Sequence, residues 1–443
     1  MKINKKSGGG RKMKGILKKA GVFALSAAMM VSLGACGGAS KDEQAKSGDG
    51  KIKLNMWHIW AAESESSKKP FEDAIAKFNE TNDKNIEIVL DATENETYKQ
   101  KMVTTIAANE APDIYFYWSG GYMQNIVEGK KVLALDEYLT EDIKGQLLDG
   151  ALDNMTFDGK VYGMGYSQAV GTFFVNNELF DKYQVKVPET YEELKTACQT
   201  FLDNGIKTPM AVGGKEAWCI DMYADMIQTR EAGVDACVAA LSKKGSFEDK
   251  GIVEGARKIQ ELVDMGAFGE NPLALSRDES EVPFYNGEVP MYFNGSWTIG
   301  NINRDDCKVK GKVSIAKFPS LSDKSDVNDF TGGASECFLV NADTKYPEEC
   351  VYALSQILPE FAKNLYEAGA GLPTWKVEVD ESKVDDLTKQ LVDLTKDASS
   401  YTLWWNTYLT GEDSETYMRL SQQLFAKEIT PEEYAKNLQT MNK

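Results

Sequence analysis

Segments with the two-residue repeat of a β-strand alternate along this chain with segments that have the spacing of an amphipathic helix. Polar and apolar residues alternate over 51–57, Phe71, Ile75 and Phe78 then fall on one helical face, and a strand pattern returns at 86–90. This order predicts an α/β fold with mostly parallel strands and helices on both faces of each sheet. In such sheets the ligand binds at the carboxyl ends of the strands, so we expect a binding site there.

The same alternation continues towards the C-terminus. A helical pattern covers 98–106, and strand patterns cover 114–118 and 173–175. Thr190 and Thr430 are each followed three residues later by a glutamate, the capping-box arrangement that begins a helix. The chain has 443 residues, whereas a single hydrophobic core stops growing at roughly 250–300 residues. We therefore predict two lobes.

The N-terminal segment has the pattern of a targeting signal. Residues 1–35 contain eight Lys and Arg residues and no acidic ones, and an apolar run occupies 20–34. A basic stretch, a short apolar run and small residues before a cleavage point are typical of a signal peptide. The run is shorter than the ~20 residues of a membrane-spanning helix. We expect 1–35 to be removed and the Gly/Ser-rich 36–50 to be a flexible tether.

Cys36 follows Leu33-Gly34-Ala35, and these four residues resemble a bacterial lipobox. The resemblance implies a lipoprotein in which Cys36 becomes the N-terminus and carries a diacylglycerol, with palmitate among its acyl chains. Two acyl chains give stable membrane anchoring where one gives only marginal binding. We expect an extracytoplasmic protein that is anchored by lipid to the bacterial cell membrane. A plain signal peptide followed by an incidental cysteine is the alternative.

The charge balance excludes several function classes. The chain carries 50 basic and 68 acidic residues, and without 1–35 the count is 42 against 68, a formal charge of −26. Such a chain repels nucleic acid and anionic membrane surfaces, so we expect no nucleic-acid partner. His58 is the only histidine, which argues against an imidazole-based catalytic triad or a histidine-rich metal site. We expect neither a catalytic residue, a metal nor a cofactor.

Six cysteines follow Cys36 at long, irregular spacings, without a CxxC pair: Cys198, Cys219, Cys237, Cys307, Cys337 and Cys350. This spacing signals neither a redox dithiol nor a zinc knuckle. Buried free thiols are favoured slightly over disulfides, because a chain of this length does not need covalent cross-links to fold. An oxidising environment outside the cell would permit either free thiols or disulfides.

Several stretches occur in the same order as in the extracellular solute-binding proteins of sugar ABC transporters, the family that includes maltose-binding protein. They are WHIW at 57–60, APDIYFYWSGGY at 111–122, DGKVYG at 158–163, TFFVNNELF at 172–180, FYNGEVPMYFNGSW at 284–297 and GGAS at 332–335. The chain resembles this family from about residue 52 to 405. Its sequence departs from the family's usual residues at Val170-Gly171 and Asn176-Asn177.

The resemblance implies a two-lobed, type II periplasmic-binding-protein fold whose lobes are joined by hinge crossovers and close over a sugar. Lobe one would comprise 51–169 and 322–358, and lobe two 171–320 and 361–443. It further implies a monomer that delivers a mono- or oligosaccharide to the permease subunits of an importer. The sequence has no P-loop, so ATP hydrolysis would belong to a separate ATPase chain.

A sugar site needs flat aromatic side chains for the C–H faces of the ligand, and the sequence offers tryptophans at suitable positions. Trp297 follows an Asn-Gly turn and Trp118 ends a strand, as the family's stacking residues do. Trp60 lies just beyond the first strand, unlike Trp57 within it. The other candidates are Trp218, Trp375, Trp404 and Trp405. Side chains adjacent in sequence point in different directions. We therefore expect one of Trp404 and Trp405 to stack on the ligand and the other to pack in the core, and the sequence does not say which is which.

Polar groups must satisfy the sugar hydroxyls. Glu63 and Glu65 follow Trp60, and Asp91 and Glu94 follow the second strand. Ser119 begins a Ser-Gly-Gly loop where backbone amides can approach a ligand. The remaining polar candidates are Tyr166, Asn294 and Glu336. Surface charge is the alternative interpretation for the acidic residues.

Two other functions stay open at this point. The same fold can bind a polyamine or another small cation, which suits an acidic, aromatic-rich chain better than an anionic ligand does. A lipid-anchored glycoside hydrolase would need two carboxylates either about 5–5.5 or about 6.5–9.5 Å apart across a cleft. The sequence nominates no such pair.

Overall fold

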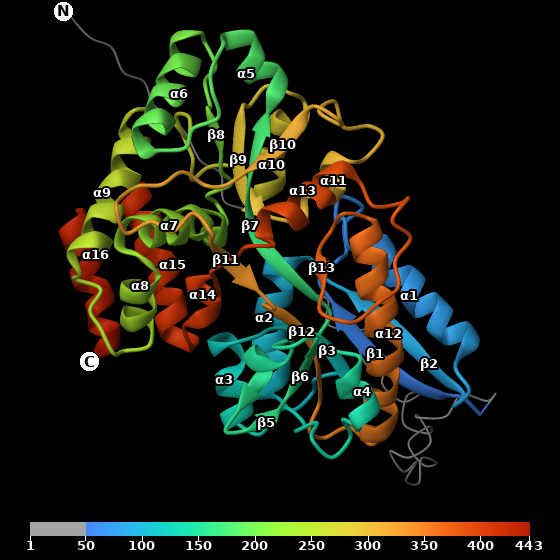
Figure 1. Cartoon of the computed structure of the whole chain (residues 1–443). Helices are drawn as coiled ribbons and strands as arrows, with labels where there is room; N and C mark the ends of the chain where they lie inside the picture. The colour runs from blue at the N-terminus through green and yellow to red at the C-terminus, as the bar shows by residue number, and fades with distance from the viewer. Residues whose placement is uncertain (1–49) are drawn as a thin grey trace, which may run out of the picture. The chain divides into compact units, whose positions relative to one another are not determined.

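A computed structural model describes residues 50–443 of the chain (Figure 1). All helices and strands described below belong to the unit formed by residues 51–443. The predicted signal peptide, Cys36 and nearly all of the predicted tether lie outside the described residues. Within 50–443, no helix is both long enough and apolar enough to cross a membrane.

The first sheet has five strands in the order β2-β1-β3-β12-β6. Its strands are β1 Ile52–His58, β2 Ile86–Ala92, β3 Ile114–Trp118, β6 Gly163–Gly165 and β12 Glu336–Val340. β1 is parallel to β2 and to β3, whereas β12 is antiparallel to β3 and to β6. The helices around it are α1 Lys68–Thr81, α2 Asn95–Ala107, α3 Gly121–Glu128, α4 Glu141–Gly145 and α12 Pro347–Glu367. A short hairpin joins β4 Thr156–Phe157 to β5 Lys160–Val161. We call this part the first lobe.

The second sheet is built around one long strand, β7 Ser167–Asn176, which enters it directly from the first lobe (Figure 1). The other strands are β8 Met210–Ala211, β9 Met291–Gly295, β10 Val313–Ala316, β11 Asp329–Gly333, β13 Leu372–Pro373 and β14 Ser400–Thr402. β7 is antiparallel to β9, β10, β11 and β13, and only the pairs β8–β9 and β11–β14 are parallel. We call this part the second lobe.

The predicted α/β class and two-lobed fold are confirmed. The sheets are mixed and not mostly parallel, because two of the four strand pairs in the first sheet and two of the six in the second are parallel. The parallel rule applies where each strand is joined to the next by a helix, as β1, β2 and β3 are. β7 is instead reached from the other lobe without an intervening helix, and it runs against the strands that pair with it.

The second lobe contains most of the helices. They are α5 Asn177–Tyr183, α6 Tyr191–Asp203, α7 Ala217–Ala232, α8 Val234–Leu241, α9 Lys250–Asp264, α10 Arg277–Tyr285, α11 Thr298–Ile302, α13 Asp386–Thr395, α14 Trp405–Tyr408, α15 Gly411–Phe425 and α16 Pro431–Leu438. The capping boxes predicted at Thr190 and Thr430 are present at the starts of α6 and α16. α7 is buried along nearly its whole length and packs against α9 and α15. Short 3₁₀ turns cover Asp153–Met155 and Gln439–Asn442.

Two large hydrophobic cores correspond to the two sheets. The first joins residues between Leu54 and Tyr166 to residues between Ala334 and Trp375. The second joins residues between Ala169 and Leu321 to residues between Trp404 and Met441. We propose lobe boundaries near 334 and 375 in place of 322 and 358, because β11 pairs with β7 while α12 packs in the first core. All six cysteines of the described chain are free, and all but Cys307 are buried.

Candidate functional site

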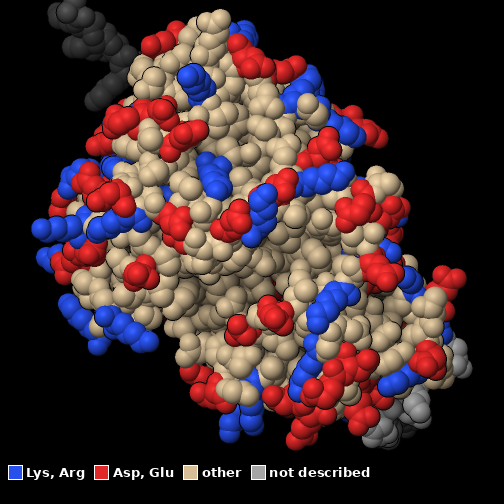
Figure 2. Space-filling model, in the orientation of Figure 1, with Lys and Arg blue, Asp and Glu red and all other residues tan. Residues whose placement is uncertain are grey.

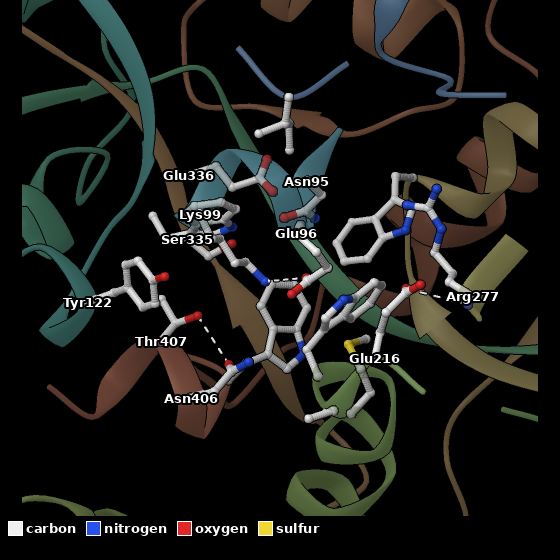
Figure 3. A pocket seen from close by; sticks show the side chains of 18 of the residues that line it. Asn95, Glu96, Lys99, Tyr122, Glu216, Arg277, Ser335, Glu336, Asn406 and Thr407 are labelled. Atoms are coloured by element: carbon white, nitrogen blue, oxygen red, sulfur yellow. Dashed lines mark hydrogen bonds and ion pairs between the residues drawn. The ribbon is translucent and has the colours of Figure 1, made fainter. Parts of the chain in front are cut away.

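A cavity of about 640 Å³ lies where the carboxyl ends of β1 and β3 face the second lobe (Figure 3). Its first-lobe wall contains Trp60 just after β1, the start of α2, and Trp118 at the end of β3. β12 begins at the same edge because it runs antiparallel, and this brings Glu336 into the wall. The cavity therefore lies at the strand ends where an α/β sheet is expected to bind its ligand.

Three tryptophans of the second lobe form one continuous aromatic wall. Trp218 lies in the first turn of α7, Trp297 precedes α11, and Trp404 precedes α14. The ring of Trp297 is edge-on to both others, with centroid distances of 6.3 Å to Trp218 and 5.7 Å to Trp404. Edge-to-face packing fixes the plane of each ring. The wall can therefore present rigid indole surfaces to a ligand.

Aromatic side chains also line the first-lobe wall. The rings of Trp118 and Tyr122 are 5.3 Å apart, and the Lys99 ammonium lies 5.1 Å from the Trp118 ring centroid. Trp60 is only 4% exposed, and its ring is edge-on to that of Tyr166 at 5.8 Å. Trp60 and Tyr166 thus form the buried floor of the cavity, whereas Trp118 and Tyr122 are partly accessible.

Charged side chains of both signs line the cavity, with carboxylates in excess. The carboxylates are Glu65, Glu94, Glu96, Glu216, Glu336 and Glu415, and the cations are Lys99, Lys215, Arg277 and Arg419. Lys99 pairs with Glu96 at 2.7 Å, and Arg277 pairs with Glu65 at 2.9 Å. Lys215 and Arg419 are exposed. The paired cations are already neutralised, so the interior favours a neutral or cationic ligand over an anion.

Glu336 is the carboxylate whose acidity the cavity changes most. Burial raises the pKa of Glu336 to about 7, against the opposing effect of the hydrogen bond that the Tyr166 hydroxyl donates to it. Burial likewise raises the pKa of Glu216, while the neighbouring Arg277 lowers it. A carboxyl group near half-protonation at neutral pH can both donate to and accept from a hydroxyl group.

The structure brings seven of the thirteen predicted site residues to the cavity: Trp60, Trp118, Tyr166, Trp218, Trp297, Glu336 and Trp404. Their contact with a ligand remains a prediction. The sequence left open which of Trp404 and Trp405 faces the ligand. In the structure, Trp404 lines the cavity and Trp405 is fully buried.

The other two tryptophans expected at the site lie in the protein core. The indole N–H of Trp375 donates to the carbonyl oxygen of Gly165 at 2.8 Å, and its side chain is 1% exposed. Trp405 is the first residue of α14, and its ring packs against those of Phe247 and Tyr417. Neither ring lines the cavity, because both are packed inside a hydrophobic core.

Four predicted polar residues also lie away from the cavity, each with a partner. Glu63 is exposed and pairs with Lys68, and Asp91 pairs with Lys101 at 3.2 Å on the outside of β2. The Ser119 hydroxyl donates to the Ala334 carbonyl oxygen at 2.8 Å, which ties β3 to the start of β12. Asn294 lies on the same strand face as Tyr292, and these two side chains form hydrogen bonds with each other and with Glu281 inside the second lobe.

Several residues that line the cavity were not among the predicted set, including Asn95, Glu96, Lys99, Tyr122, Glu216, Arg277, Ser335, Asn406, Thr407 and Gln422. Figure 3 shows Asn406 and Thr407 on one side and Asn95 and Glu96 on another. The loop after β2 was expected near the ligand, but its contribution begins at Glu94 and not at Asp91. Arg277 and Asn406 carry no local pattern that would single them out.

Within residues 50–443, no group of three or more His, Cys, Asp or Glu side chains is placed to hold a metal ion. On the face shown in Figure 2, acidic and basic side chains are interspersed, and no broad basic surface is visible.

A model of the family described as bacterial extracellular solute-binding protein matches residues 61–372. The chain belongs to this family. Its members bind solutes for ABC transporters, so the chain is an extracytoplasmic solute-binding protein and not an enzyme. This excludes the alternative of a glycoside hydrolase.

Several relatives of this solute-binding protein are named as sugar-binding proteins. It is 39% identical to a chain from a structural study of xylan utilization by the thermophilic bacterium Caldanaerobius polysaccharolyticus, with a TM-score of 0.84 over 88% of this chain and 100% of that one. A chitin oligosaccharide binding protein is 23% identical, with a TM-score of 0.79 over 88% of this chain and 98% of that one. The multiple sugar-binding protein of Streptococcus mutans is 23% identical over 89% of this chain and 91% of its own.

Proposed function

We propose that this solute-binding protein captures a xylan-derived oligosaccharide in the cavity between its lobes. The observation that carries the proposal is the wall formed by Trp218, Trp297 and Trp404, which faces the first-lobe side chains across one cavity. Sugars present C–H groups on their ring faces, and indole rings cover such faces while excluding water. A row of three indoles suits a chain of sugar rings better than a single ring.

The polar lining supports a neutral polyol. Hydroxyl groups at the ring edges need acceptors and donors, and the cavity provides Glu336, Asn95, Asn406 and Thr407. Its volume of about 640 Å³ lies within the ~300–1,000 Å³ of small-molecule sites. The choice of xylan follows from the relative that is 39% identical over its full length, because that protein belongs to a study of xylan utilization.

The mode of action that we propose is closure of the two lobes over the sugar, followed by delivery of the intact ligand to the permease of an importer. Closure removes water and strengthens the hydrogen bonds to the ligand. The signal-peptide pattern of 1–35 and the lipobox-like Cys36 support a receptor that is held at the outer face of the cell membrane by lipid, and we propose that it acts as a monomer. A separate ATPase chain would supply the energy for import.

A thermal-shift panel tests this function. We expect xylotriose to xylohexaose to raise the melting temperature, because a ligand that binds only the folded state stabilises it by mass action. Maltotetraose, cellotetraose and chitotetraose serve as comparison ligands, and chromatography should recover each xylo-oligosaccharide intact. Failure of every xylo-oligosaccharide to shift the transition would contradict the proposal.

The excess of carboxylates in the cavity favours one second candidate, a polyamine. Spermidine therefore belongs in the same panel, at low and at high salt. A charged ligand would lose affinity steeply as salt rises, whereas a neutral sugar would not. A stabilisation by spermidine that disappears in high salt, without any response to sugars, would favour the polyamine.

A further inference from the structure

We propose that Asp225, which lies outside the cavity, is a positioning residue that fixes the α14 turn and thereby holds Trp404 in the aromatic wall. The inference rests on the proposed function of the cavity as the ligand site. It concerns a residue that touches neither the cavity nor any ligand bound there.

Asp225 joins three helices of the second lobe. It lies in the middle of α7 and is fully buried. The backbone N–H of Trp405 donates to Asp225 Oδ2 at 2.9 Å, and the Tyr417 hydroxyl donates to Asp225 Oδ1. Trp405 is the first residue of α14, and Tyr417 belongs to α15. One carboxylate thus links α7 to the start of α14 and to α15.

The N–H groups in the first turn of a helix have no partner within the helix, and an acceptor from outside must satisfy them. α14 has only four residues, and the side chain of Trp404 at its N-cap position makes no capping hydrogen bond. A helix this short has little stability of its own. Asp225 therefore provides the cap that α14 cannot provide for itself.

The α14 turn is the element whose position matters for the cavity. Trp404, Asn406 and Thr407 all line the cavity from this one turn. On its other side, the Ser414 hydroxyl donates to the Asn406 carbonyl oxygen at 2.6 Å. If the N-terminal end were released, the turn could pivot about Ser414, and the indole of Trp404 would leave its edge-on contact with Trp297.

Asp221 offers a matched control on the same helix. It lies one turn before Asp225 on α7, is equally buried, and neither of its oxygens has a hydrogen-bond partner on α14. Truncation of either aspartate removes the same atoms from the interior of α7. Only truncation of Asp225 removes the acceptor of the Trp405 N–H.

The test uses protein labelled with 5-fluorotryptophan, with the ¹⁹F resonance of Trp404 assigned by the Trp404→Phe variant. In the ligand-free protein, we expect Asp225→Ala to shift or broaden the Trp404 resonance, and Asp221→Ala to leave it in place. Asp225→Asn should restore the wild-type spectrum, because its amide oxygen still accepts from Trp405 and its amide N–H can donate to Tyr417. Should Asp225→Ala fail to fold, Tyr417→Phe removes one of the two hydrogen bonds and should move the same resonance by less.

A Trp404 resonance that is unchanged in every folded Asp225 and Tyr417 variant would overturn the inference, as would an equal shift in Asp221→Ala. Calorimetry with xylotetraose adds a second readout, in which we expect about tenfold weaker binding for Asp225→Ala, the size of effect that one hydrogen bond gives. If wild-type protein does not bind xylotetraose, the proposed function fails. The ligand-free spectra still decide whether Asp225 positions Trp404.

Discussion

Arg277 of the second lobe donates to the Glu65 carboxylate of the first lobe at 2.9 Å, directly beside the cavity. Glu65 belongs to a loop between β1 and α1 that makes two further contacts with the second lobe. The Ser66 hydroxyl donates to the Trp297 carbonyl oxygen at 3.0 Å, and Arg304 donates to the Glu63 carbonyl oxygen at 3.1 Å. These three hydrogen bonds join the two lobes directly and stabilise the arrangement seen in the structure.

Arg304 tests this stabilisation, because it does not line the cavity. We expect Arg304→Gln to raise the dissociation rate of the sugar by about 1.4-fold to fivefold, since exposed charged contacts contribute roughly 0.2–1 kcal/mol. Stopped-flow tryptophan fluorescence measures this rate. Arg257→Gln is the control, because the Arg257 side chain is 43% exposed, against 46% for Arg304, and its partners Glu254 and Glu432 lie in its own lobe. Equal effects of both variants would contradict the role assigned to this loop.

Trp297→Ala should weaken sugar binding by about 2 kcal/mol, the range of a central aromatic contact at a binding site. The loss has two sources, since the variant removes one indole surface and leaves Trp218 and Trp404 without their shared neighbour. Isothermal titration calorimetry measures the affinity. In the control Trp375→Phe, we expect a lower melting temperature from the lost hydrogen bond to Gly165 and an unchanged affinity. Wild-type affinity in Trp297→Ala would show that the aromatic wall is not the ligand site.

Gly121→Ala should hinder lobe closure without disturbing either lobe. A Cβ atom at Gly121 would lie 2.1 Å from the Tyr408 carbonyl oxygen, which belongs to α14 of the second lobe. Overlap with a backbone atom cannot be relieved by a side-chain rotation, so the lobes must separate. We expect small-angle scattering in the presence of sugar to show a larger radius of gyration than for wild type. Gly145→Ala is the control, because no atom lies within 4 Å of its Cβ position; a compact, sugar-bound Gly121→Ala would refute the prediction.

The raised pKa of Glu336 predicts how stability depends on pH. The folded state holds the Glu336 proton up to a pKa of about 7, whereas the unfolded value is 4.5. The resulting stabilisation is complete below pH 4.5 and is lost as the pH rises through 7. At 1.36 kcal/mol per pKa unit, this corresponds to at most about 3 kcal/mol. We expect Glu336→Gln to have a flatter melting-temperature profile between pH 5 and 8 than wild type or the exposed-site control Glu415→Gln; parallel profiles would contradict the assignment.

The sequence predicted those parts of the fold that depend on local patterns. Alternation over 51–57 and 86–90 identified β1 and β2, and the capping boxes at Thr190 and Thr430 identified the starts of α6 and α16. Strand pairing around β7 could not be predicted in the same way, because it depends on how the chain re-enters the sheet after more than 100 residues.

The candidate site was predictable to the extent that its residues follow strand ends. Trp118, Trp60 and Glu94 do so, and all line the cavity. The direction of a side chain within an irregular turn was not predictable, which is why Trp404 and Trp405 could not be separated. For Asn294 the strand itself was expected, but the face on which Tyr292 and Glu281 gather depends on residues distant in sequence.

The central claim is that the indole wall binds a xylan-derived oligosaccharide, and a calorimetric titration of the protein with xylotetraose tests it most directly. We predict saturable binding of one ligand per chain, little change between low and high salt, and recovery of intact tetrasaccharide. Absence of heat and of any fluorescence change at millimolar xylotetraose, in protein shown to be folded, would contradict the claim.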